Sequence, residues 1–232
     1  MNAGRTARER ARAELTQEIK DEARRQLATA GAGGLSLRAV ARELGMVSSA
    51  LYRYFANRDE LLTALIIDAY NALGETVEAA DRAVPKDQPR ARWRSVCHAA
   101  RTWALANPHE YTLIYGSPVP GYHAPEATVE SAGRSYFVLL GVLRDADRAG
   151  TLTPAYAGPP LSEPLAAQFR VVADAVGPEL SPATLNRGFI ALSQLFGMLN
   201  FELFGQFVGS VDPTDEFFAH TVEQMAEFIG LC

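Results

Sequence analysis

Apolar residues recur at helical spacing along almost the whole 232-residue chain, and this pattern limits the fold more than any other feature. Within residues 13–30, four of them share one helical face: Leu15, Ile19, Ala23 and Leu27. No run of β-branched residues alternates with polar residues between turn signals, as half-buried strands require. The sequence therefore predicts an all-α fold, and 48% hydrophobic residues are enough to fill its core.

Turn and capping signals divide this pattern into separate helices. The glycine-rich run at 31–34 ends the helix at 13–30, and Ser36 is a good N-cap for a second helix that ends at Gly45. Asn57 and Glu60 form a variant capping box at the start of a long helix over 57–80. Further helices are expected at 91–107, 108–115, 126–149, 161–176, 182–207 and 213–229.

Charge is distributed unevenly along the chain. Residues 1–60 carry 11 Lys and Arg against 8 Asp and Glu, a net charge of +3, whereas residues 61–232 carry 11 against 19, a net charge of −8. A basic head on an acidic body is typical of a DNA-binding module joined to a separate effector domain. We therefore expect a DNA-binding domain over 1–56 and an effector-binding and dimerisation domain over 57–232.

Residues 36–55 hold the most informative pattern, two short helices separated by Gly45. A turn this tight prevents the helices from lying parallel, which is typical of a helix-turn-helix. The residues expected on the outer face of the second helix, with donors for phosphates and base edges, are Ser48, Ser49, Tyr52 and Arg53. The same spacing also fits a plain helical hairpin in an all-α core, whose exposed Tyr and Arg are ordinary surface residues.

The region around this motif resembles the signature of the TetR family of regulators. The resemblance covers about residues 15–62 and rests on Gly45 and on two stretches, Ala50-Leu51-Tyr52-Arg53-Tyr54-Phe55 and Asn57-Arg58-Asp59-Glu60-Leu61-Leu62. It implies a three-helix DNA-binding domain, followed by a larger helical domain that binds a ligand and dimerises. The implied function is sequence-specific transcriptional regulation.

The resemblance also implies roles for individual residues. Arg38 matches a base-reading position, whereas Tyr52 and Arg58 match positions that bind phosphate. The full set of implied DNA contacts is Ser36, Arg38, Ser48, Ser49, Ala50, Tyr52, Arg53, Tyr54 and Arg58. Val47 departs from the pattern, because the family commonly has a capping Ser or Thr there; Ser48 is the alternative cap, which would commit part of its hydroxyl to the backbone.

The N-terminus carries a basic arm over about residues 1–12, with Arg5, Arg8, Arg10 and Arg12. Two interpretations of this arm are equally consistent with its sequence. It resembles the arms that some DNA-binding proteins lay along the minor groove or backbone, and it also fits a disordered tail that only aids solubility.

Large aromatic rings are concentrated in the central third of the chain, where the resemblance places a ligand cavity. A further stretch resembles an actinobacterial subgroup of the family, through Trp103-Ala104, Pro108, Glu110-Tyr111 and Gly116-Ser117-Pro118-Val119-Pro120-Gly121-Tyr122. Each ring alone also fits plain core packing, but the group favours a small apolar effector that releases a repressor from its operator. An activator fits the sequence as well. The candidate pocket residues are Trp103, Tyr111, Tyr115, Phe137, Phe196 and Asn200.

The last two helices carry more apolar surface than one buried face requires. We therefore expect them to pair with the same helices of a second copy in a two-fold homodimer. The candidate interface residues are Leu192, Phe196, Leu199, Leu203 and Phe204.

Sequence signals for catalysis, cofactors, metals and membranes are weak. The four histidines are scattered, and GxSxG, Walker A and GxGxxG patterns do not occur, so no enzyme activity, cofactor or metal is expected. Cys97 and Cys232 lie far apart, no apolar run follows the N-terminal arginines, and the most apolar stretch is only fourteen residues, 188–201. A cytoplasmic protein is therefore expected. The alternative is an all-α carrier or enzyme that keeps the N-terminal hairpin as scaffold.

Overall fold

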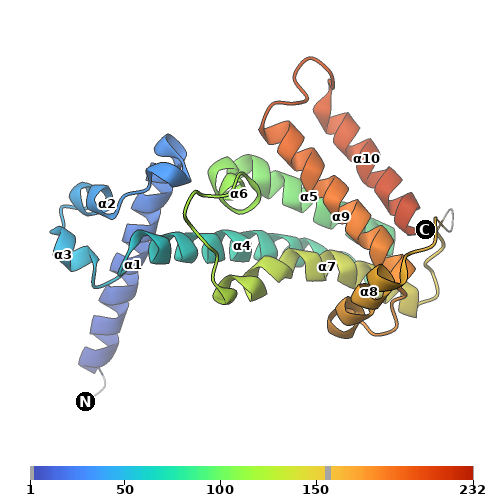
Figure 1. The fold of residues 1–232 in the computed structure, drawn as a ribbon, viewed down its shortest axis with the longest axis horizontal. Helices are drawn as coiled ribbons and strands as arrows, with labels where there is room; N and C mark the ends of the chain where they lie inside the picture. The colour runs from blue at the N-terminus through green and yellow to red at the C-terminus, as the bar shows by residue number, and fades with distance from the viewer. Residues whose placement is uncertain (1–2, 155–157, 232) are drawn as a thin grey trace. The chain divides into compact units, whose positions relative to one another are not determined.

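The computed structural model describes residues 3–154 and 158–231, and side chains from residue 6 onward within these ranges. The described residues form α-helices and two short 3-10 helices with no sheet, so the predicted all-α fold is confirmed (Figure 1). The N-terminal helices are α1 (Ala3–Ala30), η1 (Ala32–Gly34), α2 (Leu37–Glu43), α3 (Ser48–Leu51), α4 (Arg58–Arg82), α5 (Pro89–Ala106) and α6 (Pro108–Tyr115). The later helices are η2 (Glu126–Thr128), α7 (Val129–Arg148), α8 (Glu163–Val176), α9 (Pro182–Leu203) and α10 (Thr214–Ile229).

The helices group into two compact units. The first unit comprises Met1–Ala69 and Asn107–Val129, and the second comprises Tyr70–Ala106 and Glu130–Cys232. Helix α4 passes from the first unit into the second after Ala69. Helix α6, which the sequence analysis assigned to the effector domain, is part of the same compact unit as α1 to α3.

Local signals explain how the helices of the first unit begin and end. The Ser36 hydroxyl accepts a hydrogen bond from the Ala39 amide at 3.4 Å and caps α2, and Gly45 adopts a φ of 64° in the turn after α2, a left-handed conformation that favours glycine. At the start of α4, the Asn57 side chain accepts from the Glu60 amide at 2.8 Å. The Glu60 carboxylate in turn accepts from the Ala56 amide at 2.6 Å, so the predicted capping box is present with its second bond one residue earlier.

The core of the first unit joins the predicted apolar faces of its short helices. Ile19 and Ala23 of α1, Val40 of α2 and Leu51 of α3 have no exposed surface, and Phe55 is 6% exposed. Burying several large side chains provides most of the stability of such short helices, which are too short to persist alone. The rigid frame around α3 therefore comes from tertiary packing.

The second unit is organised around the buried Arg92 and the half-buried Arg134 as well as apolar contacts. The Arg92 side chain on α5 is 3% exposed and donates from Nε and Nη2 to the Asp81 carboxylate at 2.8 and 3.0 Å, and from Nη1 to Asp145 at 3.0 Å. Arg134 of α7 similarly makes two 2.9 Å bonds to Glu78 of α4. A buried charge is tolerated only when it is paired and hydrogen-bonded, so these networks restrict how α4, α5 and α7 can pack.

Several helices differ in extent from the sequence expectation. Helix α1 begins at Ala3 instead of residue 13, α3 is a single turn that gives way to non-helical turns before Phe55, and α9 ends at Leu203 instead of residue 207. No helix in the described ranges is long and apolar enough to cross a membrane.

Candidate DNA interface

The outer face of α3 carries the polar residues expected from the sequence. Ser48, Ser49 and Arg53 are exposed and Tyr52 is 45% exposed, whereas Leu51 is fully buried beneath them. Ala50, half-buried, lies between these two sets. The arrangement leaves a narrow helix end with hydroxyl and guanidinium donors, which has the dimensions and chemistry to enter a major groove.

The N-cap of α3 differs from the expected one. Val47 occupies the N-cap position, its side chain makes no capping bond, and Ser48 is the first helical residue. The prediction that Ser48 caps the helix is therefore wrong, because a residue inside the first turn does not have the extended backbone of a cap. The Ser48 hydroxyl remains available to a ligand.

Val47 stood out in the sequence only as a departure from the capping position, and its exposure on the surface was not predicted. Its side chain is 70% exposed immediately before the polar face of α3. An exposed branched apolar group among hydroxyls can contact the methyl group of thymine in a major groove. The signal in the sequence was the apolar residue at a capping position, where a polar residue would serve the helix better.

Ser36 and Arg38, which lie before and within α2, line a shallow hollow together with Tyr52 and residues at the start of α4. Its full lining is Leu35, Ser36, Leu37, Arg38, Tyr52, Ala56, Asn57 and Arg58. The structure thus brings together four of the predicted DNA contacts, which are separated by up to 22 positions in the sequence. Hydroxyl and guanidinium groups around a concave surface are suited to an anion such as a phosphate.

Arg58 has partners within the protein that the sequence did not indicate. Its Nη2 donates to the Ala32 carbonyl at 2.7 Å and its Nε to the Leu35 carbonyl at 3.2 Å, while its Nη1 lies 3.6 Å from the Asp59 carboxylate. The side chain is only 30% exposed. This geometry makes Arg58 a brace between the start of α4 and the segment that leads into α2.

Tyr54 also faces the protein. The guanidinium of Arg12 stacks over its ring at 5.1 Å from the centroid, and Arg12 donates from Nη2 to the Arg53 carbonyl at 3.1 Å. A cation over an aromatic face is attracted to the ring electrons. These contacts attach α1 to the turn that follows α3. Tyr54 therefore offers less surface to DNA than Tyr52 or Arg53.

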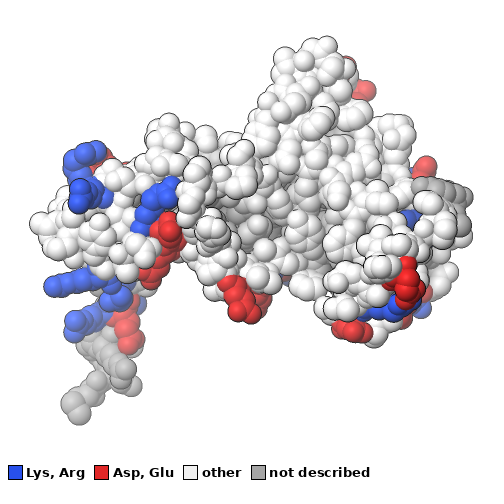
Figure 2. Space-filling view, in the orientation of Figure 1, with Lys and Arg blue, Asp and Glu red and all other residues white. Residues whose placement is uncertain are grey.

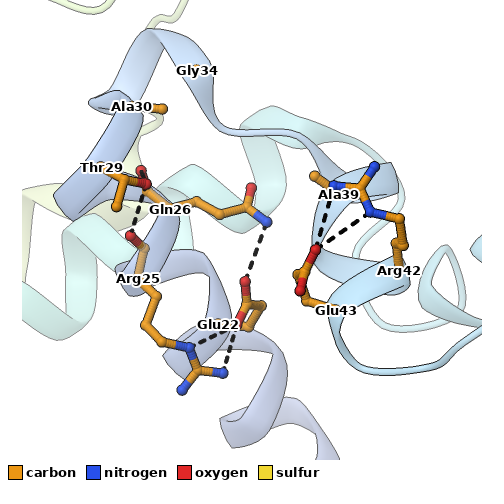
Figure 3. Close-up of a pocket in the computed structure, with 9 residues that line it drawn as sticks. All are labelled: Glu22, Arg25, Gln26, Thr29, Ala30, Gly34, Ala39, Arg42 and Glu43. Atoms are coloured by element: carbon orange, nitrogen blue, oxygen red, sulfur yellow. Dashed lines mark hydrogen bonds and ion pairs between the residues drawn. The ribbon is translucent and has the colours of Figure 1, made fainter.

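A second concave surface lies between α1 and α2, and its side chains largely satisfy one another (Figure 3). Glu22 accepts a 2.7 Å bond from Arg25, and Arg42 pairs with Glu43. The Gln26 carbonyl accepts from the Ser36 amide at 3.3 Å. These contacts position the N-cap of α2 against α1, and we assign the surface a structural role.

The six candidate pocket residues are divided between the two units. Tyr111 is fully buried and its ring lies 5.1 Å from that of Tyr115 in the first unit. In the second unit, Phe196 is 7% exposed and packs at 5.5 Å against Tyr136, and Trp103 is also 7% exposed. The two others are Phe137, which is half exposed, and Asn200, whose buried Oδ1 has no hydrogen-bond partner among the described residues.

Most of the candidate dimer residues are covered within the protomer. Leu192, Phe196 and Leu199 of α9 are at most 7% exposed, because α8, α10 and α5 pack around this helix. They have little surface left for a second copy, and this part of the interface prediction needs correction. Leu203 is half-buried and Phe204 is 44% exposed. Ile190, an apolar residue of α9 outside the predicted interface set, is 46% exposed.

Comparison with known proteins agrees with this geometry. The profile "Bacterial regulatory proteins, tetR family" matches residues 19–65, and "Tetracyclin repressor-like, C-terminal domain" matches residues 93–225. The HTH-type transcriptional regulators Mb1846 of Mycobacterium bovis and Rv1816 of Mycobacterium tuberculosis are each 38% identical over 216 residues, 91% of both chains. A solved structure of the regulatory protein SCO4313 is 35% identical with a TM-score of 0.76, covering 94% of this chain and 97% of the other. The chain therefore belongs to the TetR family and is a DNA-binding transcriptional regulator of that family.

Proposed function

We propose that the protein is a cytoplasmic repressor that binds its operator as a homodimer and is released by a small apolar ligand. The observation that carries this proposal is the polar outer face of α3 beside the hollow that contains Ser36, Arg38 and Tyr52. In functional terms, residues 1–56 would form the DNA-binding domain and residues 57–232 the effector-binding and dimerisation domain.

The DNA contacts divide into two groups by their position. Ser48, Ser49 and Ala50 at the start of α3 would approach base edges, together with the exposed Val47. The hollow would receive a phosphate, with the Tyr52 hydroxyl as a donor and Arg58 holding the surrounding backbone in place. Four further contacts complete the proposed set: Ser36 and Arg38, which line the hollow and of which Arg38 would read a base, and Arg53 and Tyr54 after α3.

The proposed dimer uses a different stripe of α9 from the one expected. Ala183, Ile190 and Gly197 recur every seven residues, which places them on one face of α9, and Phe204 follows at the same interval as the C-cap residue. Ile190 and Phe204 are 46% and 44% exposed, and a Cβ added to Gly197 would meet no atom within 4 Å. A stripe of exposed apolar residues around an open glycine fits close packing against the same helix of a second copy.

The effector would contact aromatic residues and have a hydrogen-bond donor. In the second unit, Trp103, Phe137 and Phe196 would provide the apolar surface, and the unpaired Oδ1 of Asn200 would accept a hydrogen bond from the ligand. Helix α4 continues from the first unit into the second. A ligand-induced change in the effector-binding domain can therefore alter the spacing of the two DNA-binding domains of a dimer. A tenfold release requires a preference of about 1.4 kcal/mol for the non-binding arrangement.

A mobility-shift assay with the promoter of the protein's own gene, at physiological salt, tests the DNA-binding part of the proposal. Wild type should prefer one fragment over unrelated DNA of equal length. Tyr52→Phe should weaken this binding, because it removes the hydroxyl from the hollow. Tyr122→Phe is the matched control, since it removes a hydroxyl that pairs with Thr63 in the same unit.

Two outcomes would contradict the proposal. Wild type without any sequence preference would favour the alternative, an all-α carrier or enzyme with the helix-turn-helix as scaffold. If both Tyr→Phe variants changed the operator affinity equally, the Tyr52 hydroxyl would not be a DNA contact. Repressor action and release are tested by transcription from the same promoter with and without ligands retained by the purified protein.

A further inference from the structure

Helix α1 extends far beyond the part of it that packs into the first unit. It begins at Ala3, yet among the side chains that the structure describes, from Thr6 onward, the first buried one is Ile19, and every side chain from Thr6 to Glu14 is exposed. An isolated helical segment gains nothing from burial and is only marginally stable in water. The extension is therefore a structural feature that core packing does not explain.

The charges of this extension are separated onto two faces. Arg8 and Arg12 are four residues apart and share one face, with Glu9 at its margin. At 3.6 residues per turn, Arg10 and Glu14 lie on the opposite side of the helix. The Arg8 and Arg12 face, which we call the basic face, therefore has a direction that a disordered tail would lack.

The contacts of Arg12 show where the basic face points. Its guanidinium donates to the Arg53 carbonyl and covers the Tyr54 ring, and both residues lie in the turn that follows α3. Arg8, one turn nearer the N-terminus, thus lies on the α3 side of the helix and is exposed. Figure 1 shows α1 running past α3 toward the N-terminus, and Figure 2 shows Lys and Arg side chains projecting from this end of the chain.

We infer that the N-terminal turns of α1 form a second DNA-binding surface, whose basic face follows the phosphate backbone next to the groove that α3 enters. The inference rests on the proposed DNA contact by α3. Arginine binds phosphate through charge and hydrogen bonds without reading sequence, so this surface adds affinity on any DNA. Glu14 faces away from the duplex, which avoids repulsion by the phosphates. Because Arg12 already orders the helix, binding costs less conformational entropy than with a flexible arm.

The test compares two variants that change the same residue type on opposite faces. Arg8→Ala removes a charge from the basic face, and Arg10→Ala removes one from the other side with the same change in net charge and helix propensity. Affinities for operator and unrelated DNA are measured by fluorescence anisotropy at 50 and 200 mM salt. Circular dichroism checks that both variants keep the helix content of wild type.

Arg8→Ala should flatten the salt dependence, whereas Arg10→Ala should behave like wild type. Losing one phosphate contact per protomer lowers the slope of log affinity against log salt by about 0.9, or about 1.8 in a dimer. Between 50 and 200 mM salt, the factor by which Arg8→Ala loses affinity should then be about tenfold smaller than the factor for wild type. This difference should be the same on operator and on unrelated DNA. Arg8→Lys, which keeps the charge, should retain the wild-type slope.

Equal slopes for Arg8→Ala and Arg10→Ala would overturn the inference. So would an Arg8→Lys slope as low as that of Arg8→Ala, since the effect would then not depend on charge. Failure of wild type to prefer any DNA fragment would instead refute the proposed function. The two failures are thus distinguishable.

Discussion

Replacing Arg58 distinguishes a structural brace from a phosphate contact. In the structure, Arg58 donates two charged hydrogen bonds to the carbonyls of Ala32 and Leu35. Hydrogen bonds from charged groups contribute about 1.5 to 3 kcal/mol each, and the 30% exposure of the side chain places these at the lower end. In Arg58→Ala, water molecules take over part of the hydrogen bonding to the two carbonyls. The variant should therefore destabilise the native packing of α2 by about 2 kcal/mol. This corresponds to about 30-fold more frequent opening.

Amide hydrogen exchange measures this opening directly. In Arg58→Ala, the amides of α2 should exchange about 30-fold faster than in wild type. Arg58→Lys should also exchange faster, because a single ammonium group lacks the fork that reaches both carbonyls. Arg42→Ala is the matched control, since Arg42 is an exposed arginine of α2 that pairs only with the adjacent Glu43 in the hydrogen bonds and ion pairs described above.

The salt dependence of operator binding provides the refuting result. A brace leaves the number of phosphate contacts unchanged, so Arg58→Ala should keep the wild-type slope. Normal exchange in α2 together with a slope reduced by about 0.9 per protomer would show that Arg58 binds phosphate. In that case Arg58→Lys should restore most of the affinity.

Three further predictions test specificity, assembly and pH dependence. Arg38→Ala should relax the preference at one operator position by about 1 to 3 kcal/mol, whereas equal weakening on all sequences would assign Arg38 to phosphate. Ile190→Glu should give a monomer in light scattering at micromolar concentration while Val171→Glu, on an exposed part of α8, stays dimeric; a dimer in both would exclude the α9 stripe. The hydrogen bond from Arg134 holds the pKa of Glu78 below its ordinary value of 4.5, so the ionised carboxylate stabilises the fold above that pH and the stabilisation is lost as pH falls. The melting temperature of Glu78→Gln should therefore fall less than that of wild type between about pH 6 and pH 3, and parallel curves would contradict this.

Features that depend on neighbours in the sequence were predictable. Apolar spacing indicated the helices, Ser36 and Gly45 indicated where α2 begins and ends, and the Asn57 capping box indicated where α4 begins. The same local pattern indicated the helix-turn-helix and its outer face, because a short helix shows both its buried and its exposed side within a few residues. Family resemblance added the expected roles, and the comparisons confirmed the family.

Features that depend on distant segments needed the tertiary structure. The partners of Arg58 are carbonyls 23 and 26 residues away, and no periodicity encodes such a contact. The N-terminal turns of α1 lack an apolar stripe, so their helical extension was not visible from hydrophobic spacing. In α9, apolar residues occur on several faces, and only the packing of α5, α8 and α10 decides that Leu192 and Leu199 are covered while Ile190 is exposed. Burial is a property of the neighbours that a fold brings together, and sequence spacing alone ranks all apolar faces of a helix equally.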